Sequence, residues 1–522
     1  MNKRGGDHKM LALLAEPAKV KLIGYFENPY DLSLAAAKTC YSPCVIETLE
    51  ITEKQRDSIG PLTYDSGHHT VYQHVHFVFG LENISRQFVW SVLHSHPFYN
   101  SEQSSQRYVR LDEVRAFAPP IKKEAKECYE QSVQTAWGYY RKLSEILQKD
   151  TFKILGEMRN LTPKSDEARH KKVIKEAEKK AIELARYCLP IGAYTSMIHT
   201  ISGITLHRLY RLMRSSDVPY ENTLVIKAMV DCVNEVDPDF FGRVGDPPLL
   251  PYQIPEYRLP HLQPVSENYI KEFDKDLGEL TSKLYDYSPN GEEVIAEALR
   301  SVFGVIKDKL STDEALDLLL NPSKNSYRLD KLNLSFHSPI MRALFHTSYT
   351  FKKRISHTAD SQDQRHRMVP ASRPLMNFTV SRKPDYITPM LIKQNNEAIE
   401  CFVSSMEKAW EGYNALLSMD VPHEFALYLL PNAVALRFIE SGQFLYLLHK
   451  WTMRTCLNAQ EEIYEASMQE VEQVRKVHPR LARYIGPNCV LRAKNVTPYC
   501  TEGAHFCGVP VWKIFPDVNR KL

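Results

Sequence analysis

Apolar residues recur at helical spacing in one stretch of each half of the chain. In the first half, apolar positions three or four residues apart alternate with lysine, glutamate and arginine; they are Ile174, Ala177, Ala181, Leu184 and Cys188. The spacing predicts an amphipathic helix, beginning within residues 164–180, whose charged face is exposed to solvent. The lysines of that face, Lys171, Lys172, Lys179 and Lys180, favour solvation over a nucleic-acid patch. In the second half, Phe444, Leu447, Leu448 and Trp451 mark another helix, and Arg454 closes its last turn.

Short runs rich in β-branched and aromatic residues predict strands between such helices. The runs are Val75–Leu81, Leu334–Phe336 and Thr347–Phe351. A mixture of helices and strands of this kind is typical of α+β domains. We therefore expect an α+β fold.

A proline-rich segment divides the chain near its middle. Six prolines fall within residues 246–264, and this density blocks helices and removes donors from a strand ladder. We predict an N-terminal half over residues 1–245, a linker over 246–266 and a C-terminal half over 267–522. Chains of 522 residues are long enough for two domains.

The two halves contain a weak internal repeat. Three pairs of segments resemble each other: LARYCLP at 184–190 and ALYLLP at 426–431, Ala136–Tyr139 and Ala409–Tyr413, and Tyr41–Pro43 and Tyr287–Pro289. The offset between copies is larger at the tryptophan pair than at the Leu-Pro pair. The first half therefore carries extra residues between these landmarks, and the charged helix that begins within residues 164–180 is the candidate.

Composition and charge exclude several classes of function. The 66 basic and 63 acidic residues leave a formal charge of +3, so there is no global electrostatic reason to expect a nucleic-acid or membrane partner. There is no GxGxxG, GxxxxGK[ST] or GxSxG motif, which removes the main signal for dinucleotide, P-loop and hydrolase sites. Any phosphate is expected to be bound by side chains.

No apolar run approaches the length of a membrane helix, about 20 residues, and the patch Leu11–Ala15 is too short for a secretory signal. We expect a cytoplasmic protein. Ten irregularly spaced cysteines fit reduced thiols better than disulfides. Zinc could be imagined at Cys40, Cys44, Cys500, His505 and Cys507, but the spacings match no familiar finger, so we expect free thiols and no metal.

Two polar segments could carry chemistry. Gln362–Arg367, QDQRHR, ends in three donors, of which two are planar permanent cations suited to bidentate binding of phosphate or carboxylate. Asn100–Tyr108, NSEQSSQRY, places hydroxyls, amides and one arginine between apolar flanks. Taken separately, the first could be a solvated surface patch and the second an ordinary capped turn.

Together, the two segments resemble the signature of the flavin-dependent thymidylate synthases. That family has an arginine-histidine-arginine triplet followed by seven variable residues and a serine, with surrounding sequence of the type NEQSQRYV. Arg365-His366-Arg367 matches the triplet, and Tyr99–Val109, YNSEQSSQRYV, resembles the downstream part with inserted residues. The resemblance covers most of residues 25–245 and 340–465.

Further segments carry the same resemblance. His68, Thr70 and Gln73 in GHHTVYQH are similar to the family's flavin-contacting GHxTPFEH, and Ala36–Tyr41 looks like its early helix. Arg186 resembles the nucleotide-contacting arginine before the family's Leu-Pro. Gln362 corresponds to its nucleotide-binding glutamine. Arg454 with Asn458–Ile463 looks like its late arginine and AQxEI tail.

Each half also departs from the family pattern, and the departures are complementary. In the first half the triplet positions are read as Trp90-Ser91-Val92, and the late arginine's position falls on Met213. In the second half, Leu375 replaces the serine, Leu427 stands at the position of Arg186, and the flavin-contacting histidine and threonine give way to residues near Ile340 and Arg342. Because each half keeps what the other lacks, we interpret the chain as two fused, specialised subunits that together build composite sites. Random decay of a duplicated gene is the alternative.

The resemblance implies a fold of two tandem domains, each an antiparallel sheet flanked by helices, and it implies roles for residues of both halves. In the family, a homotetramer forms its sites between subunits. The residues expected to contact dUMP are Gln362, Arg365, Glu102, Gln103, Ser104, Ser105, Arg107, Arg186 and Arg454. Those expected to contact FAD are His68, Thr70, Gln73, Glu102, Arg365, His366, Arg367, Gln443 and His449. Arg454, which would polarise the uracil N3/O2 edge, and Arg365 are the catalytic candidates.

The implied activity is the reductive methylation of dUMP to dTMP by a methyltransferase. Methylenetetrahydrofolate would supply the carbon, NADPH would reduce the FAD, and two chains would reproduce the four-unit core as a homodimer. The alternative is a non-catalytic protein of the same fold that binds nucleotide or flavin. The histidines at positions 68, 69, 74, 76, 94 and 96 could ligate a metal, but structural or flavin-facing roles are favoured.

Overall fold

Two four-stranded antiparallel sheets of identical topology form the centre of the protein. The computed structural model describes residues 16–163, 165–258, 267–493 and 495–522. The first sheet has the order β1-β2-β4-β3 and the second the order β5-β6-β8-β7. The strands are β1 Lys19–Gly24, β2 His76–Ser85, β3 Tyr99–Gln103, β4 Tyr194–Ser202, β5 Ser282–Tyr287, β6 Ser348–Ser356, β7 Ala371–Ser372 and β8 Ala435–Gln443. The α+β prediction with antiparallel sheets is confirmed.

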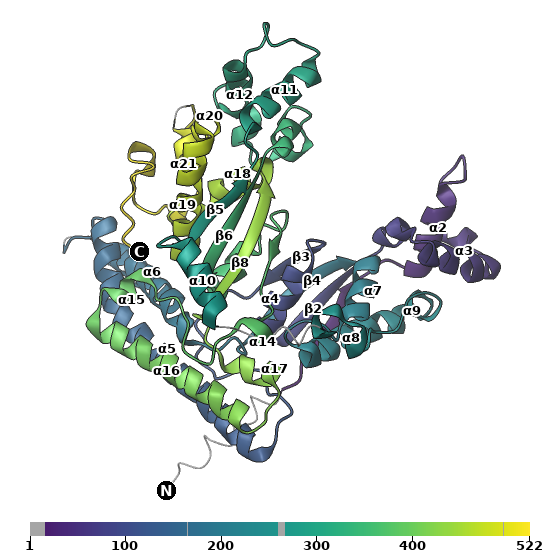
Figure 1. The fold of residues 1–522 in the computed structure, drawn as a ribbon, viewed down its shortest axis with the longest axis horizontal. Coiled ribbons are helices and arrows are strands. Elements are labelled where there is room, and N and C mark those ends of the chain that lie inside the picture. The colour runs from purple at the N-terminus through teal and green to yellow at the C-terminus, as the bar shows by residue number, and fades with distance from the viewer. Residues whose placement is uncertain (1–15, 164, 259–266, 494) are drawn as a thin grey trace.

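Helices flank both sheets (Figure 1). Those of the first half are α2 Pro29–Thr39, α3 Glu53–Asp65, α4 Arg86–Ser95, α5 Lys123–Met158, α6 Glu167–Ala185, α7 Gly203–Leu212, α8 Pro219–Val236 and α9 Asp239–Gly242. Those of the second half are α10 Glu267–Leu277, α11 Gly291–Phe303, α12 Thr312–Leu320, α13 His357–Asp363, α14 Met376–Thr379, α15 Met390–Lys393, α16 Asn396–Ser418, α17 His423–Ala426, α18 Phe444–Arg454, α19 Glu461–Val477, α20 Pro479–Ala482 and α21 Asn488–Arg492. The predicted helices correspond to α6 and α18.

The strand predictions had mixed outcomes. The runs Val75–Leu81 and Thr347–Phe351 fall largely within β2 and β6. The run Leu334–Phe336 is wrong as a strand, because Leu334–His337 is a short 3-10 helix. Its Phe336 ring stacks on Tyr446 of α18 at 5.4 Å, so this half-buried side chain packs against a helix instead of within a sheet. The patch Leu11–Ala15 lies outside the described residues.

One of the three repeat pairs is also wrong. Tyr287 ends β5, the first strand of the second half, whereas Tyr41 follows α2, the first helix of the first half. The tryptophan and Leu-Pro pairs do occupy matching places. Between residues 246 and 258, within the predicted linker, the chain forms only two short 3-10 helices, Pro251–Gln253 and Pro255–Arg258.

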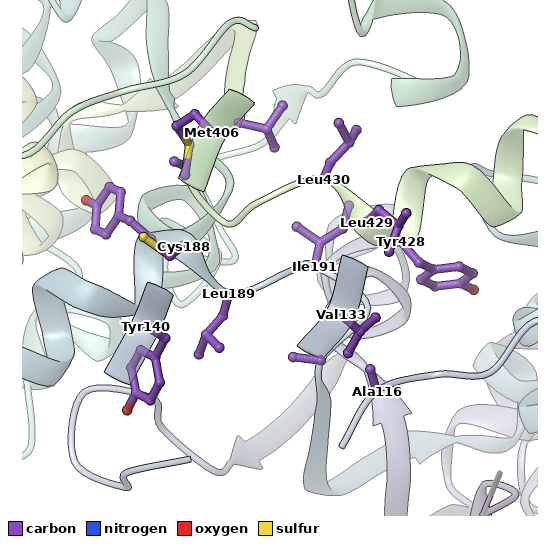
Figure 2. Packing of buried hydrophobic residues seen from close by; sticks show 14 of the residues in the cluster. Ala116, Val133, Tyr140, Cys188, Leu189, Ile191, Met406, Tyr428, Leu429 and Leu430 are labelled. Carbon is purple, nitrogen blue, oxygen red and sulfur yellow. The ribbon is translucent and has the colours of Figure 1, made fainter. Parts of the chain in front are cut away.

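Of the three hydrophobic clusters among the described residues, one is shared by the two halves, and each half also has a cluster of its own. The long helices α5 and α16 lie side by side (Figure 1), and their Trp137 and Trp410 are both buried. Figure 2 shows how the segments around Leu189 and Leu430 meet within the shared cluster, with side chains of both halves packed around them. Because burial of apolar surface is the main favourable contribution to folding, the halves stabilise each other.

Reciprocal backbone hydrogen bonds join the two Leu-Pro segments. Ile191 N donates to Leu430 O at 2.8 Å, and Asn432 N donates to Leu189 O at 2.7 Å, while Pro190 and Pro431 face each other as an antiparallel bridge. Gly192 permits this approach, since a Cβ there would lie 2.8 Å from the Tyr428 carbonyl oxygen. Contacts that repeat with the partners exchanged are typical of twofold symmetry. The halves therefore pack as a pseudo-dimer within one chain.

Two buried carboxylates bind the halves together on either side of this axis. Glu221 accepts hydrogen bonds from the Ser85 amide at 2.7 Å, the Ser85 hydroxyl at 2.6 Å and the Tyr428 hydroxyl of the other half at 2.7 Å. Glu462 accepts the same bonds from the Ser356 amide and hydroxyl at 2.7 and 2.6 Å, and from the Tyr187 hydroxyl. Ser85 and Ser356 also cap α4 and α13. Because Ser85 and Ser356 make the same contacts, they are equivalent positions. The residues that follow them can therefore be aligned between the halves.

Buried histidines predict a loss of stability in acid. Burial lowers the pKa of several of them, to about 4 for His94, His96 and His207 and to about 3 for His199 and His357. The unfolded chain would bind protons from its ordinary pKa of about 6.5 downward. The free energy of unfolding should therefore fall as the pH falls from about 6.5 toward 4, by up to about 1.4 kcal/mol per pH unit for each histidine. Urea unfolding at pH 7.5, 6 and 5 measures this.

A single substitution should reduce this dependence. His207 lies among the rings of Tyr64, Phe240 and Phe241, so His207→Phe removes one titrating group from an aromatic environment. The control is His170→Gln, a half-exposed histidine near the start of α6. A urea midpoint that stays constant from pH 7.5 to 5 in the unmodified protein would contradict the prediction.

Candidate active site

The structure brings the two predicted polar segments together, from opposite halves of the same chain. Arg365 donates from Nη1 to the Ser101 carbonyl oxygen at 2.9 Å and from Nη2 to Glu102 Oε2 at 2.7 Å. The Arg367 guanidinium lies 5.3 Å from the centre of the Tyr99 ring. The segment after α13 therefore packs directly on β3, which leads into the serine-rich loop.

Arg107 lies where the loop meets α6 and the segment after α18. Its Nε donates to Glu183 at 2.7 Å and its Nη2 to the Asn458 carbonyl oxygen at 2.9 Å. Burial alone would raise the pKa of Glu183, but Lys180, Arg107 and Arg186 outweigh it and hold that pKa well below its usual range. Glu183 is thus a buried anion that anchors several cations.

Arg186 is buried at the start of the short 3-10 helix Arg186–Cys188. Its Nη2 donates to Gln460 Oε1 at 3.1 Å, whereas its Nε is buried without a partner in the described structure. Burial lowers the pKa of Arg186; Glu183 opposes this shift and Arg107 adds to it. A buried cation with an unused donor, close to a second cation, is suited to bind an anion.

Arg454 ends α18 and points at the triplet. Its Nε donates to His366 Nε2 at 2.8 Å and its Nη2 to the Gln362 carbonyl oxygen at 3.1 Å. Burial lowers the pKa of Arg454 to about 10; Asp363 opposes the shift, and Arg107 and Arg365 add to it. The pKa of His366 is held well below its ordinary value by burial and by Arg454. His366 is therefore neutral and accepts the Arg454 hydrogen bond.

The remaining loop residues are held by both halves. Gln103 accepts from Arg86 at 3.2 Å, the Ser104 hydroxyl lies 2.8 Å from that of Ser196, and the Ser105 hydroxyl accepts from the Arg107 amide at 3.2 Å. Gln106 accepts from Asn432 of the second half at 3.1 Å. The Gln362 side-chain oxygen accepts from the backbone N–H of Gln460 at 3.2 Å. The inserted residues thus form an ordered loop beside the arginines.

A cavity of about 600 Å³ lies between the end of α4 and the triplet. Its walls include His366, Arg367 and Gln443, all predicted flavin contacts. Both amide atoms of Gln364, which also lines it, are buried without partners in the described structure. A cavity with cations and unused amide donors and acceptors fits a ligand with a polar ring edge and phosphates, as FAD has. His449 is near it, its ring 6.1 Å from that of His366.

The other predicted flavin contacts lie apart from the triplet within one chain. His68, Thr70 and Gln73 are exposed at the short 3-10 helix His69–Gln73, which packs on α2 and α7. Figure 1 places α2 and α7 on the side of the molecule away from α18. The structure therefore does not join these three side chains to the rest of the candidate site.

The predicted counterpart of the triplet is wrong. Counting from the paired caps Ser85 and Ser356, Arg365-His366-Arg367 corresponds to His94-Ser95-His96 instead of Trp90-Ser91-Val92. Trp90 is structural: its Nε1 donates to the buried Asp360 at 2.8 Å and joins α4 to α13. In the family, seven residues separate the triplet from a serine. Counted back from Ser104, this spacing gives His94-Ser95-His96, so it was the signal that could have given the correct alignment. His94-Ser95-His96 lines the same cavity as the triplet.

Sequence reasoning missed a buried ionic cluster beneath the triplet. It consists of Lys353, Lys450, Asp363, Glu440 and Glu470, each at most 2% exposed. Lys450 Nζ lies 2.9 Å from Asp363 and 2.7 Å from Glu440, and Lys353 Nζ lies 2.7 Å from Glu470. The corresponding residues of the first half are Leu81, Leu209, Val92, His199 and Met229. The cluster therefore belongs to the second half alone.

The zinc candidates do not form one site. Cys40 and Cys44 lie at and just beyond the end of α2, on the opposite side of the molecule from the C-terminal segment that carries Cys500 and Cys507 (Figure 1). Within the described residues, no three histidine, cysteine, aspartate or glutamate side chains are placed to hold a metal ion. No described helix is long and apolar enough to cross a membrane.

Comparisons with known proteins identify the family. The family model described as thymidylate synthase complementing protein matches residues 21–239 and again 283–480. The flavin-dependent thymidylate synthase of Clostridium tetani is 30% identical over 232 residues, which are 44% of this chain and 86% of the relative. That of Sulfurisphaera tokodaii is 33% identical over 40% of this chain and 79% of the relative. That of Geobacter sulfurreducens is 28% identical over 45% of this chain and 98% of the relative.

Most of the length of each of these relatives aligns with less than half of this chain. The family model matches the chain twice. This is the pattern of a duplicated sequence, and the two sheets of identical order agree with it. The chain belongs to the flavin-dependent thymidylate synthase family, as a tandem-duplicated FAD-dependent enzyme.

Proposed function

We propose that this protein converts dUMP to dTMP in composite sites whose nucleotide-binding part is built from both halves of one chain. Methylenetetrahydrofolate would provide the carbon and NADPH the reducing equivalents. The observation that carries the proposal is the convergence of four arginines: Arg107 and Arg186 come from the first half, Arg365 and Arg454 from the second. Burial lowers the pKa of Arg454, and Arg107 and Arg365 add to this shift, which supports a shared electrostatic environment for the three arginines.

The first half would bind the nucleotide phosphate. Arg107 and Arg186 provide the planar donors, and the Ser104 and Ser105 hydroxyls lie on the same loop. Each charge-assisted hydrogen bond to phosphate contributes about 1.5–3 kcal/mol. Glu183 holds Arg107 in place at 2.7 Å, so part of the ordering of this side chain precedes binding. Glu102 and Gln103 would complete the nucleotide contacts.

The second half would act on the uracil ring. The Arg454 guanidinium is held by His366 and the Gln362 carbonyl oxygen, and it would present its remaining donor to the N3/O2 edge. A fixed cation in a buried site stabilises negative charge that develops on the ring. Because His366 is neutral, it positions Arg454 without repelling it. Gln362 and Arg365 would hold the nucleotide from the same side.

The FAD would lie in the cavity beside the triplet, whose walls include His366, Arg367 and Gln443. Arg365 of the triplet and His449 would contact it from beside the cavity. When bound, it supplies the redox chemistry. His68, Thr70 and Gln73 are exposed on the remote side of the first half, so a second chain would be needed to bring them to a flavin. We therefore propose a homodimer that forms a pseudo-tetramer.

One observation favours the non-catalytic alternative. Arg365 and Arg107 already have carboxylate partners, Glu102 and Glu183, and a site closed by internal ion pairs would bind nucleotide weakly. The Arg365 pair is solvent-exposed, with side-chain exposures of 43% and 79%, and such pairs contribute about 1 kcal/mol or less. A dianionic phosphate can displace it.

Assay of the purified protein decides between the proposed enzyme and the non-catalytic alternative. We expect the oxidised-flavin absorption band and dTMP formation from dUMP with NADPH and methylenetetrahydrofolate. Arg454→Met, which introduces the residue of the corresponding first-half position, should reduce turnover at least about a hundredfold, because it removes a charged group that acts in the transition state. Met213→Leu is the matched control and should remain active. A flavin-containing protein without dTMP synthesis would favour the alternative, and a protein that does not take up added FAD would contradict the proposed activity.

A further inference from the structure

A second, larger cavity adjoins the candidate site. Its volume is about 1000 Å³, and Arg107 and Asn458 lie in its wall as well as at the candidate site. The other walls come from α5, α6 and a C-terminal segment, residues 502–522. That segment lies outside both stretches that match the family model, because the second stretch ends at residue 480. The cavity is therefore not explained by the family fold alone.

The cavity is strongly basic. Seven of its lining residues are basic, and three, Glu176, Glu183 and Glu502, are acidic. Glu176 pairs with Arg159 at 3.1 Å, and Glu183 is used by Arg107 and Lys180. Lys179 has no carboxylate within ion-pair distance among the described residues, and Lys172 reaches only the Ala504 carbonyl oxygen at 3.4 Å. Positive charge therefore remains uncompensated.

Arg520, in the wall of this cavity, has donors that are not used within the protein. Its Nη2 donates to the Ala459 carbonyl oxygen at 2.7 Å, and its guanidinium lies 4.8 Å from the centre of the Tyr464 ring. Its Nε and Nη1 are buried and have no partner in the described structure. Burial lowers the pKa of Arg520, an effect that Glu183 and Glu461 oppose. Buried donors of a cation are costly to leave unpaired, and an anion would satisfy them.

We propose that this cavity binds the polyanionic end of a co-substrate whose reacting part lies at the candidate site. The ligand chemistry is a chain of phosphate or carboxylate groups contacted by Arg520, Lys179 and Lys172. The proposal rests on the proposed function for the identity of the co-substrates. Two sources fit: the phosphates of the dinucleotide reductant and the glutamate carboxylates of an extended folate. The apolar side chains in the wall, among them Leu155 and Met158, accommodate the organic part.

Direct binding tests the proposal without any need for turnover. Tripolyphosphate and a tetra-γ-glutamate peptide are titrated separately into the full-length protein by calorimetry. We expect at least one probe to bind, and Arg520→Gln and Lys179→Gln each to weaken it about tenfold, since each removes a charge-assisted contact. The matched control is Lys175→Gln, an exposed lysine of α6 that does not line the cavity. Arg520→Lys, which retains the charge, should keep part of the affinity.

The two probes distinguish the sources. Preference for tripolyphosphate assigns the phosphate-bearing reductant, and preference for the peptide assigns the folate chain. If both bind equally, the cavity recognises charge alone. If neither binds more tightly to the unmodified protein than to Lys179→Gln, the proposal is overturned, even if the protein makes dTMP. Because Lys179 is exposed, that variant is expected to fold, and unchanged circular dichroism verifies this.

Discussion

Chains that carry Arg107→Ala and chains that carry Arg365→Ala should each lose most dTMP synthesis, and mixing them should restore none of it. Each substitution removes a charged donor, which reduces activity by about 10- to 100-fold or more. The side chains lie in the same chain, where the segment around Arg365 packs on Ser101 and Glu102 at the start of the Arg107 loop. A mixed dimer would therefore contain one defect in every site.

Coexpression with separate affinity tags isolates the mixed dimer for the assay. If sites instead joined the first half of one chain to the second half of its partner, the mixed dimer would contain one intact site, and about half of the activity would return. Arg110→Ala is the control, because Arg110 is exposed and forms an ion pair with the nearby Asp112. Near-normal activity in either single variant would contradict the composite-site interpretation.

Lys353→Leu should be the most destabilising single substitution considered, because it breaks the buried ionic cluster. Removing Lys353 leaves Asp363, Glu440 and Glu470 with Lys450 as their only cation in the cluster. Breaking a buried ion pair from one side costs about 3–5 kcal/mol, since the remaining charges stay desolvated. Chemical denaturation should show this as a loss in the free energy of unfolding, with flavin release if the triplet shifts.

The first half provides the matched comparison for this loss. Its corresponding positions are apolar except for His199, so a well-packed alternative to the ionic cluster already exists in the same fold. Replacing all five residues with those counterparts, as Lys353→Leu, Lys450→Leu, Asp363→Val, Glu470→Met and Glu440→His, should recover most of the stability. If the single variant is as stable as the unmodified protein, the cluster is not the source of stability that we infer.

The fold class and much of the candidate site could be predicted because they depend on local pattern. Helical periodicity gave α6 and α18, and two short motifs located the triplet and the Arg107 loop. Their meeting in space follows from the complementary losses in the two halves. The alignment of Trp90-Ser91-Val92 is displaced by four residues from His94-Ser95-His96. It failed because it did not use the family's spacing of seven residues between the triplet and the serine, which leads back from Ser104 to His94-Ser95-His96.

Other features have no local signature. Lys352 and Lys353 are neighbours in β6, yet one is partly exposed and the other is buried in the ionic cluster. Nothing in the sequence of two adjacent lysines indicates that one will find three carboxylates from distant segments. The basic cavity likewise combines α6 with residues more than three hundred positions later in the chain. Lysines that look solvated in sequence thus line a binding surface only once the C-terminal segment is in place.

Covalent fusion across the pseudo-twofold axis changes how substitutions act on this protein. In a homodimer, a substitution near the axis appears in both partners at once, so an improvement on one side can be a defect on the other. Here Tyr187 and Tyr428, or Lys353 and Leu81, are separate positions. Each side of the axis can therefore vary alone. The ionic cluster in the second half and its mostly apolar counterpart in the first half show that the two sides of the axis differ in this way.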